Sequence, residues 1–356
     1  MRNSTPVKLP PYRIETTFSA QSLAEVTDWG LAAYAIPQHW RNTAGQGVRV
    51  AVLDTGIQLD HPDLADAIES SRDFTSNRNG AIDRNGHGTH AAGIIAARQN
   101  GRGVVGVAPL CRLLIGKVLD DSGQGSSEAV AAGIDWACKQ GVDIINLSLG
   151  SDQPDSTLLA AIRRAIAEGR WVIAAAGNDG GANAGASRVN YPARWSETIA
   201  VAAVDRNGRL SQFSSQGPEV DIAAPGQDVL STFINSGYAK LSGTSMAAPF
   251  VAGVAALLLS LHRLASDART PLNDIQALRE HLLRTAQDAG PTGHDPGYGW
   301  GLINPTQLLI EPLPTTPPQT EPPPHQPGNP QDRIPPVVIG NITLNDQPGV
   351  LVFEPR

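Results

Sequence analysis

Cysteine and positive charge are scarce in this chain of 356 residues. Two cysteines, Cys111 and Cys138, are too few for a disulfide scaffold; we interpret them as buried structural thiols, which suit a reducing compartment. The 27 Lys and Arg residues are outnumbered by 34 Asp and Glu residues. The resulting net charge of −7 excludes the basic footprint of a nucleic-acid-binding protein, so we expect no nucleic-acid partner.

Long apolar segments are missing as well. No uninterrupted apolar run reaches the roughly 18 residues that a membrane-spanning helix needs. Residues 1–17 lack the apolar stretch of a secretory signal peptide. We therefore expect no membrane span and a cytoplasmic location.

Glycine and proline, by contrast, are abundant, with 36 and 28 residues, which predicts many tight turns, a low-complexity segment, or both. Proline is concentrated in residues 311–336, which we interpret as an extended linker that cannot bury a core. The last residues, 337–356, predict two short strands around Asn345–Gly349. Residues 1–24 are polar and proline-punctuated, and we interpret them as an N-terminal extension.

Residues 25–310 alternate short apolar runs with helical stretches, and the alternation does not break. The apolar runs predict strands at 48–53, 113–119, 143–148, 171–176 and 198–204, and the stretches between them predict helices at 89–97, 126–139, 156–168, 244–262 and 272–286. Continuous apolar strands alternating with helices indicate a parallel sheet covered on both faces. We therefore expect one α/β domain, a three-layer sandwich with a mainly parallel central sheet, rather than the two domains that length alone suggests.

Asp54 stands at the end of the apolar run in VAVLDTGI. A carboxylate at the carboxyl end of a parallel strand lies where open α/β sheets place their functional sites. For this segment alone, the alternative is an aspartate that only caps a helix or forms a turn.

His87 follows a glycine in NGHGTHAAG and opens a predicted helix. The small residues behind it let that helix pack closely against a sheet, and an imidazole on a surface-facing turn is free to exchange protons. His90 lies three positions further on, so a metal-binding pair is the alternative, although no HExxH spacing is present.

Ser245 begins a long apolar helix in SGTSMAAPFVAG. A serine at a helix start is usually only an N-cap. The same place offers backbone N–H groups and a helix dipole that stabilise a developing oxyanion, so this segment alone leaves both roles open.

The chain order Asp54, His87, Ser245 is the Asp–His–Ser order of subtilisin, and the residues around each of the three also match. From about Glu25 to Asn304 the sequence resembles the subtilisin-like serine proteases (subtilases, peptidase family S8). The resemblance implies that Ser245 is a nucleophile, that His87 is its general base and that Asp54 orients the imidazole. It also implies that the side-chain amide of Asn178, in AAAGNDGG, donates to the oxyanion.

The resemblance further implies a peptide-binding channel. INLSLG matches a wall of S1, the pocket for the residue before the cleaved bond, and SGQG matches a strand that pairs with substrate backbone. Asn190 aligns with the base of S1 and Asp179 with its rim, so we expect a moderately polar pocket. Ser127, in place of a bulky residue, predicts an open S4 pocket. The implied substrate-binding residues are Gly123, Gln124, Gly125, Ser148, Leu149, Gly150, Gly177 and Asn190.

A structural calcium site is implied in the same way. Asp63, in HPDL, matches an aspartate ligand of the family, and the loop RQNGRGV has the family's full length. Oxygen ligands from carboxylates, an amide and carbonyls suit Ca²⁺. The alternative is a surface turn without metal, because two arginines crowd the loop. The implied ligands are Glu25, Asp63, Asn100 and the carbonyls of Arg98, Arg102 and Val104.

The N-terminal extension contains VKLPPY and resembles the short LIPY-type extension of intracellular subtilisins, which lies across the active site until it is cleaved. The implied inhibitory residues are Leu9, Pro10, Pro11 and Tyr12. A proline beside the bond that would be cut fixes φ and removes a hydrogen-bond donor. The alternative is a disordered tail.

The leading hypothesis is an intracellular serine endopeptidase that acts on peptides or proteins, is stabilised by calcium, and is latent until its N-terminal segment is cleaved. The alternatives are a dedicated peptide-maturation protease and a catalytically inactive peptide-binding module. Phe250 stands where the family usually has histidine, which predicts a difference in packing rather than in catalysis. The oligomeric state, a homodimer included, stays open.

Overall fold

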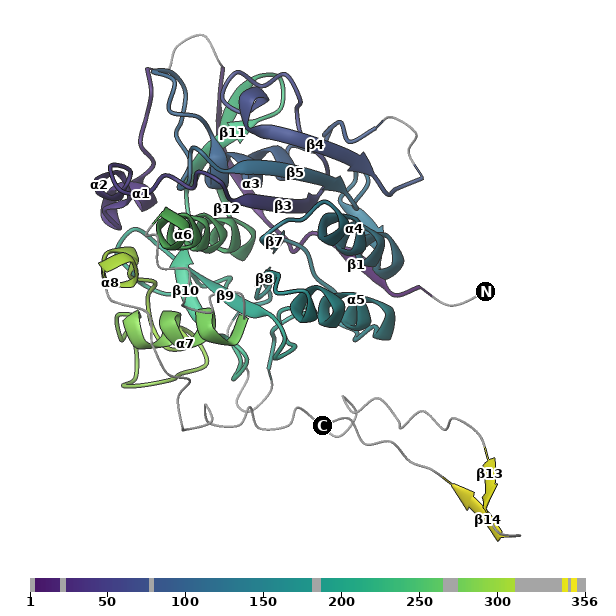
Figure 1. Cartoon of the computed structure of the whole chain (residues 1–356). Coiled ribbons are helices and arrows are strands. Elements are labelled where there is room, and N and C mark those ends of the chain that lie inside the picture. The colour runs from purple at the N-terminus through teal and green to yellow at the C-terminus, as the bar shows by residue number, and fades with distance from the viewer. Residues whose placement is uncertain are drawn as a thin grey trace. The chain divides into compact units, whose positions relative to one another are not determined.

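The computed structural model describes residues 4–19, 24–76, 80–180, 187–264 and 275–310, and two strands at 341–344 and 347–350. By its internal contacts the chain divides into two units, Met1–Thr320 and Glu321–Arg356. The first unit contains the whole α/β architecture (Figure 1). The predicted linker at 311–336 lies outside the described residues.

A seven-stranded sheet forms the centre of the first unit. Its strand order is β10-β9-β8-β7-β3-β5-β4, and every neighbouring pair is parallel. The strands are β3 (Arg49–Asp54), β4 (Ile68–Asp73), β5 (Arg112–Lys117), β7 (Ile144–Leu147), β8 (Trp171–Ala175), β9 (Ile199–Val204) and β10 (Ile222–Pro225). Five of them are the predicted strands, within two residues at each end. β4 was missed because it is a partly exposed edge strand without an apolar run, and β10 because its sequence IAAP is short, has one β-branched residue and ends in proline.

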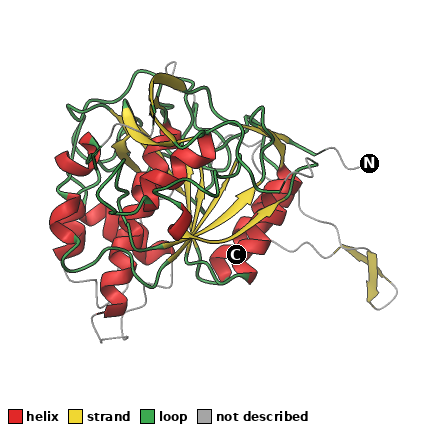
Figure 2. Cartoon of the chain, turned by 90° about the horizontal axis from the view of Figure 1, so that it is seen from above, coloured by secondary structure: helices red, strands yellow, loops and turns green. Residues whose placement is uncertain are grey.

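Alternate residues of the central strands face two separate cores, which is why the runs are apolar throughout. Val50 and Val52 of β3 pack in one core with α3 and α6, whereas Ala51 and Leu53 pack in the other with α4 and α5. Figure 2 shows the fan of strands between groups of helices. The arrangement is the expected three-layer sandwich. The four helices are α3 (His87–Ala96), α4 (Ser127–Lys139), α5 (Ser156–Ala167) and α6 (Thr244–Leu264).

α6 is the central helix of the protein, and residues 244–260 are all buried. By length and composition alone it is apolar enough to cross a membrane. The sequence did not indicate this, because polar residues interrupt its apolar run. However, 94% of its 18-residue apolar window is buried inside the protein, as in a core helix that is apolar all round. Phe250 belongs to this buried surface, and its ring packs edge-on against Tyr34 with 5.6 Å between centroids.

The remaining elements are short. They are β1 (Pro6–Lys8), β2 (Arg13–Phe18), α1 (Trp29–Ala33), α2 (Ile36–His39), a 3-10 turn (Ala65–Ala67), β6 (Gln124–Ser126), β11 (Val229–Phe233), β12 (Gly237–Ser242), α7 (Ile275–Thr285) and α8 (Pro305–Ile310). β1 pairs antiparallel with β6, and β2 joins β12 and β11 in a three-stranded antiparallel sheet. The alternative of a disordered N-terminal tail is therefore wrong for residues 4–19, since both of its strands pair with the rest of the unit.

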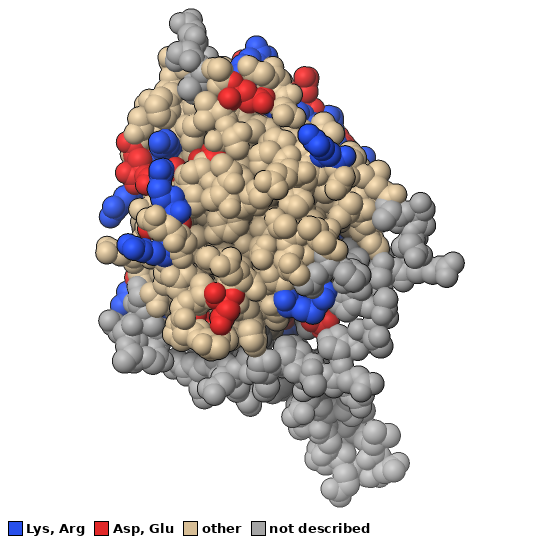
Figure 3. All heavy atoms as spheres, turned by 90° about the vertical axis from the view of Figure 1, so that its left-hand side faces the viewer, with Lys and Arg blue, Asp and Glu red and all other residues tan. Residues whose placement is uncertain are grey.

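Charged side chains are few on the face that carries α1, α2 and α8 (Figure 3). They lie mainly around the margin of this face, with both signs mixed. Among the described residues of this face there is no concentrated basic patch of the kind that binds nucleic acid.

Within the second unit, β13 (Asn341–Leu344) pairs antiparallel with β14 (Gln347–Val350). A pair of strands was expected here, but its turn was placed wrongly. Leu344 pairs with Gln347, so Gly349 lies in β14 and only residues 345–346 separate the strands.

Candidate active site

The end of β3 and the start of α3 bring an aspartate and a histidine together. Asp54 is the last residue of β3, His87 is the first of α3, and both side chains are fully buried. Nδ1 of His87 lies 2.8 Å from Oδ1 and 3.0 Å from Oδ2 of Asp54. A carboxylate at this distance holds the Nδ1 proton, which leaves Nε2 able to accept one. Nε2 is buried and has no hydrogen-bond partner among the described residues.

Glycine at position 88 sets how closely α3 approaches β3. A Cβ on Gly88 would come within 2.2 Å of the carbonyl oxygen of Gly56 and 3.2 Å of the Cβ of Asp54. The N–H of Gly88 donates to the hydroxyl of Thr55 at 2.9 Å. The glycine after the histidine is therefore a packing requirement that holds the imidazole against the carboxylate.

Asp83 was not predicted, yet it organises this corner of the site. Its Oδ1 accepts hydrogen bonds from the hydroxyl of Thr55 and the N–H groups of Asn85 and Gly86. Its Oδ2 accepts from the N–H and the hydroxyl of Thr89. One buried carboxylate thus joins the end of β3 to the first turn of α3. The available signal was an aspartate four residues before the helix-opening histidine, where side chains satisfy orphan N–H groups.

Lys117 was also missed. It lies opposite Asp54 at the end of β5 and is fully buried. Its ammonium donates to the carbonyl oxygen of Thr55 at 2.6 Å and to Oδ1 of Asp121 at 2.8 Å. A lysine that ends an apolar strand carries no sequence signal for this role.

Ser245 is the second residue of α6 and is fully buried. Its hydroxyl donates to the carbonyl oxygen of Ser148 at 3.3 Å. The hydroxyl of Ser148 donates in return to the carbonyl oxygen of Ser245 at 2.9 Å. The serine hydroxyl is thus directed to the residue that follows β7 rather than to the imidazole.

Asn178 lies beyond the end of β8 and faces the same region. Its Oδ1 accepts hydrogen bonds from the N–H and the hydroxyl of Thr244, both at 2.9 Å. These bonds orient the amide so that Nδ2 donates to the carbonyl oxygen of Pro11 at 2.7 Å. The amide therefore binds a backbone carbonyl, which is the contact that an oxyanion donor makes.

The N-terminal segment, residues 6–12, lies between two backbone edges of the site. On one side β1 pairs with β6, with Val7 opposite Gly125. On the other side Lys8 and Gly150 exchange two backbone hydrogen bonds of 2.9 Å each. The segment thus binds as the middle strand of three, in the way that extended peptides add to a sheet edge.

Val7 and Leu9 anchor this strand, the first by its side chain and the second by its backbone. Val7 is 1% exposed and packs in the core of α4 and α5. Leu9 donates its N–H to the carbonyl oxygen of Gly123 at 3.0 Å. Gly123 has a φ of +77°, and a Cβ there would lie 2.8 Å from Cδ1 of Leu9. A glycine is needed at this point because the backbone conformation and the close approach both exclude a side chain.

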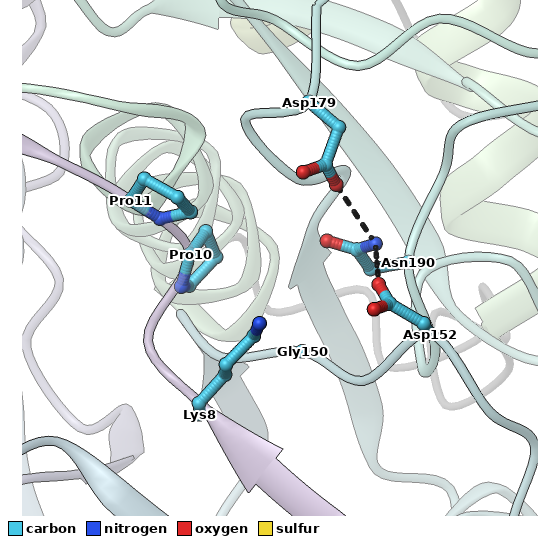
Figure 4. Close-up of a pocket in the computed structure, with 7 residues that line it drawn as sticks. All are labelled: Lys8, Pro10, Pro11, Gly150, Asp152, Asp179 and Asn190. Carbon is cyan, nitrogen blue, oxygen red and sulfur yellow. Dashed lines mark hydrogen bonds between the residues drawn. The ribbon is translucent and has the colours of Figure 1, made fainter.

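A pocket opens beside the segment, lined by Lys8, Pro10, Pro11, Gly150, Asp152, Asp179 and Asn190 (Figure 4). Nδ2 of Asn190 donates to Oδ1 of Asp152 and to Oδ2 of Asp179, each at 3.1 Å. Gly177 has a φ of +113°, and a Cβ there would lie 2.4 Å from Oδ1 of Asn190. The predicted base and rim of S1 therefore share one pocket, and Asp152 is a member that the sequence did not predict.

The predicted calcium ligands converge around the loop 98–104. Oε2 of Glu25 accepts the N–H groups of Asn100 and Gly101 at 2.8 and 2.9 Å. The carboxylate of Asp63 contacts Nδ2 of Asn100 at 3.2 Å and the N–H of Val104 at 3.0 Å.

The donor set fits a hard cation in its chemistry. No group of three or more His, Cys, Asp or Glu side chains suited to a metal occurs among the described residues, so a cation here would use two carboxylates, one amide and backbone carbonyls. The guanidinium of Arg98 donates to backbone carbonyls outside the loop, so it does not crowd the donors.

His90 and the two cysteines have buried environments. Nε2 of His90 lies 3.1 and 3.0 Å from two backbone carbonyl oxygens, and burial lowers the pKa of this imidazole to about 3. A metal site at this histidine pair is not supported, because the described residues contain no group of three or more His, Cys, Asp or Glu side chains that could hold a metal ion. Cys111 and Cys138 are free and buried as predicted, and burial raises the pKa of their thiols to about 12 and about 11.

Residues 45–301 match the model of the subtilase family (peptidase S8). The chain belongs to the subtilase family. It is 45% identical over 284 residues to a thermostable alkaline protease of Halalkalibacterium halodurans, covering 80% of this chain and 73% of that protein. It is 44% identical to subtilisin Savinase of Lederbergia lenta, with 79% and 98% covered, and 47% identical to thermitase of Thermoactinomyces vulgaris, with 67% and 84% covered. This subtilase is a serine endopeptidase.

In this subtilase the residues predicted for catalysis and for substrate binding lie in two groups. Asp54, His87, Ser245 and Asn178 come from the ends of β3 and β8 and the starts of α3 and α6. The predicted substrate-binding residues border the N-terminal segment or its pocket, with Ser148 and Leu149 buried beside it. Ser127, where we expected an open S4 pocket, is buried and instead hydrogen-bonds to the backbone of Thr5.

Proposed function

We propose that this subtilase cleaves peptide bonds through a triad of Asp54, His87 and Ser245, with Asn178 as an oxyanion donor. We also propose that the N-terminal segment, residues 6–12, keeps the enzyme latent until it is cleaved. The observation that carries both parts is a backbone carbonyl of the segment bound to the Asn178 amide at 2.7 Å. This contact supports the proposal, because a carbonyl under attack would make the same bond to an oxyanion donor.

The histidine supplies the base. Asp54 holds the Nδ1 proton of His87, so Nε2 takes the hydroxyl proton of Ser245 as its oxygen attacks the carbonyl carbon. The negative oxygen of the tetrahedral intermediate accepts a hydrogen bond from Nδ2 of Asn178. Nε2 then gives its proton to the leaving amine, and an acyl-enzyme remains. A water molecule, deprotonated by Nε2, then attacks the ester carbonyl. The serine hydroxyl recovers the proton, and the second product is released as a carboxylic acid.

Pro10 explains why the hydroxyl of Ser245 donates to Ser148 and not to the imidazole of His87. Lys8 and Gly150 exchange both hydrogen bonds, so the next such pair in an antiparallel ladder is Pro10 and Ser148. Proline has no N–H, so the carbonyl oxygen of Ser148 receives no bond from the segment. The hydroxyl of Ser245 donates to that oxygen instead and is withheld from the imidazole.

Tyr12 adds a second obstruction. Its ring centroid lies 4.9 Å from that of His87, with the planes tilted by 58°, and its hydroxyl donates to Oδ1 of Asn85 at 3.0 Å. Burial, with the nearby carboxylates of Asp54 and Asp83, raises the pKa of Tyr12 to about 12, so the phenol stays a donor. The ring therefore covers the imidazole while the segment is bound.

A structural calcium ion at the loop 98–104 is a further part of the proposal. The carboxylates of Glu25 and Asp63 at this loop support it, together with the amide oxygen of Asn100, which accepts the N–H of Arg102 at 3.2 Å. Backbone carbonyls of the loop would be additional ligands. When bound, the ion would neutralise the two carboxylates and hold the chain after the N-terminal segment against this loop. Backbone bridges from Ala24 to Arg102 and from Val26 to Val104 already join these two stretches.

A fluorophosphonate probe, which reacts with an activated serine, tests the triad and the latency separately. The full-length chain, a chain that begins at Ser22 and a Ser245→Ala variant of each are treated with the probe in the presence of calcium. We expect rapid labelling of the shortened chain, slow labelling of the uncleaved full-length chain, and none in either variant. Equal rates for the two wild-type chains would overturn latency and leave the triad standing. An unlabelled shortened chain would overturn the triad and favour a peptide-binding module.

A further inference from the structure

We propose that the pocket of Figure 4 selects a lysine or arginine before the cleaved bond, and that Asp152 and Asp179 determine this preference. The inference rests on the proposed function, since it names the substrates of the same site. Three observations support it: the side chain before the cleaved bond faces the pocket, the pocket wall is negatively charged, and Lys8 of the N-terminal segment lines the same pocket.

The residue whose carbonyl is attacked is the residue that faces the pocket. Asn178 binds the carbonyl oxygen of Pro11 at 2.7 Å, and Pro11 lines the pocket together with Pro10. Figure 4 shows both rings beside the cavity, across from Asp152, Asp179 and Asn190. A substrate that replaces this segment therefore presents the side chain before its cleaved bond to these three residues.

The wall opposite the segment carries two negative charges. Nδ2 of Asn190 donates to one oxygen of each carboxylate, which holds both side chains on the same wall. Their other oxygens accept no hydrogen bond from the residues that the structure describes. No ion pair to Asp152 or Asp179 is present within the described part of the chain. Arg188, the neighbouring cation, donates to the backbone carbonyl of Asp179 at 2.8 Å and not to its carboxylate. The uncompensated pair gives the pocket a negative potential.

The ammonium group of Lys8 is directed toward this wall without an ion pair to it among the described residues. Lys8 lines the pocket, and Figure 4 shows its side chain directed to the side that Asp152 and Asn190 occupy. Its backbone is fixed by the two hydrogen bonds to Gly150, so this direction is set by the bound strand. The N-terminal segment thus places a cation at the pocket from a neighbouring position, as a basic substrate side chain would from within it.

The side-chain chemistry decides between substrates. A lysine ammonium or an arginine guanidinium donates several hydrogen bonds to carboxylate oxygens and neutralises both charges. A leucine or phenylalanine removes water from two carboxylates and offers no bond in return. A glutamate adds a third negative charge to the pocket. The order of preference is therefore basic, then apolar, then acidic.

The test uses peptides that differ only in the residue before the cleaved bond, with Lys, Arg, Leu, Phe or Glu there. The full-length chain is incubated until its rate is constant, and its active sites are counted with the fluorophosphonate probe. We expect kcat/KM per labelled site to be about tenfold or more higher for Lys and Arg than for Leu. This ratio should fall as salt is added, because solvent-accessible charge pairs are screened.

Variants assign the preference to the two aspartates. Asp152→Asn with Asp179→Asn should bring the Lys-to-Leu ratio to about one, and Asp152→Asn alone should lie between. Glu168→Gln, an equal charge change on the exposed C-cap of α5, should leave the ratio unchanged. A double variant that keeps the wild-type ratio, or a wild type that prefers Leu or Phe, would overturn this inference while its labelled sites preserve the proposed function. A chain with no labelled site would overturn both.

Discussion

The N-terminal segment is anchored by Val7, whose side chain is buried in the core of the domain. This side chain is 1% exposed and packs in the core of α4 and α5. Val7→Ala removes two carbon groups at about 0.8 kcal/mol each, so binding of the segment weakens by about 1.6 kcal/mol. This shifts the equilibrium between bound and released segment about 15-fold toward release. The triad residues are not altered, since Val7 packs with α4 and α5, whereas His87 and Ser245 begin α3 and α6, which pack in the other core.

The assay is the initial rate of fluorophosphonate labelling of the uncleaved full-length chain, because only the released form exposes the serine. We expect Val7→Ala to be labelled about 15-fold faster than the wild type. The matched control is Ile14→Ala, in the same extension but 51% exposed on β2, which should change the rate less than about twofold. If Val7→Ala is labelled at the wild-type rate while the chain beginning at Ser22 is labelled rapidly, burial of this residue does not hold the segment, and the reasoning fails.

Three further predictions address the serine, the loop and a buried histidine. Pro10→Ala supplies the missing N–H to Ser148 and frees the serine hydroxyl, so the segment should be cut faster; N-terminal sequencing over time checks this, and an unchanged rate counts against it. A calcium chelator should lower the melting temperature by about 5–10 °C, and in Asp63→Asn calcium should no longer restore it; equal melting with and without calcium excludes the ion. Burial lowers the pKa of His90 to about 3, so the folded state binds fewer protons than the unfolded one, and stability declines as pH falls from about 6.5. The free energy of unfolding, measured in urea at several pH values between 6.5 and 4, should therefore depend less steeply on pH in His90→Gln than in the wild type. The difference should be up to one proton, about 1.4 kcal/mol per pH unit, and an equal pH dependence in the two proteins refutes the prediction.

Local sequence was sufficient to predict the central layers and to single out the segments that contain Asp54, His87 and Ser245. The strand that contains Asp54 is apolar throughout because it faces two cores, and such a run is visible without knowledge of its neighbours. The helix starts at His87 and Ser245 lie in segments whose small residues are dictated by close packing, as at Gly88. These features depend on residues adjacent in the chain.

Contacts between distant segments decided the rest. Asp152 and Asp179 meet only through Asn190, which is 38 and 11 residues away from them, so neither could be assigned to one wall of a pocket beforehand. In the sequence, Asp83 is indistinguishable from an ordinary turn residue. In the structure its carboxylate bonds to both Thr55, after β3, and Thr89, in α3.

The amino-acid sequence by itself determined the α/β layers, the candidate site residues that the motifs contain and a proline-rich N-terminal extension. Only the tertiary structure decided that this extension forms a middle strand, with β1 paired to β6 on one side and Lys8 bonded to Gly150 on the other. The physical reason is that apolar periodicity and helix starts are set by neighbouring residues, whereas strand register is set by hydrogen bonds between backbones far apart in the chain.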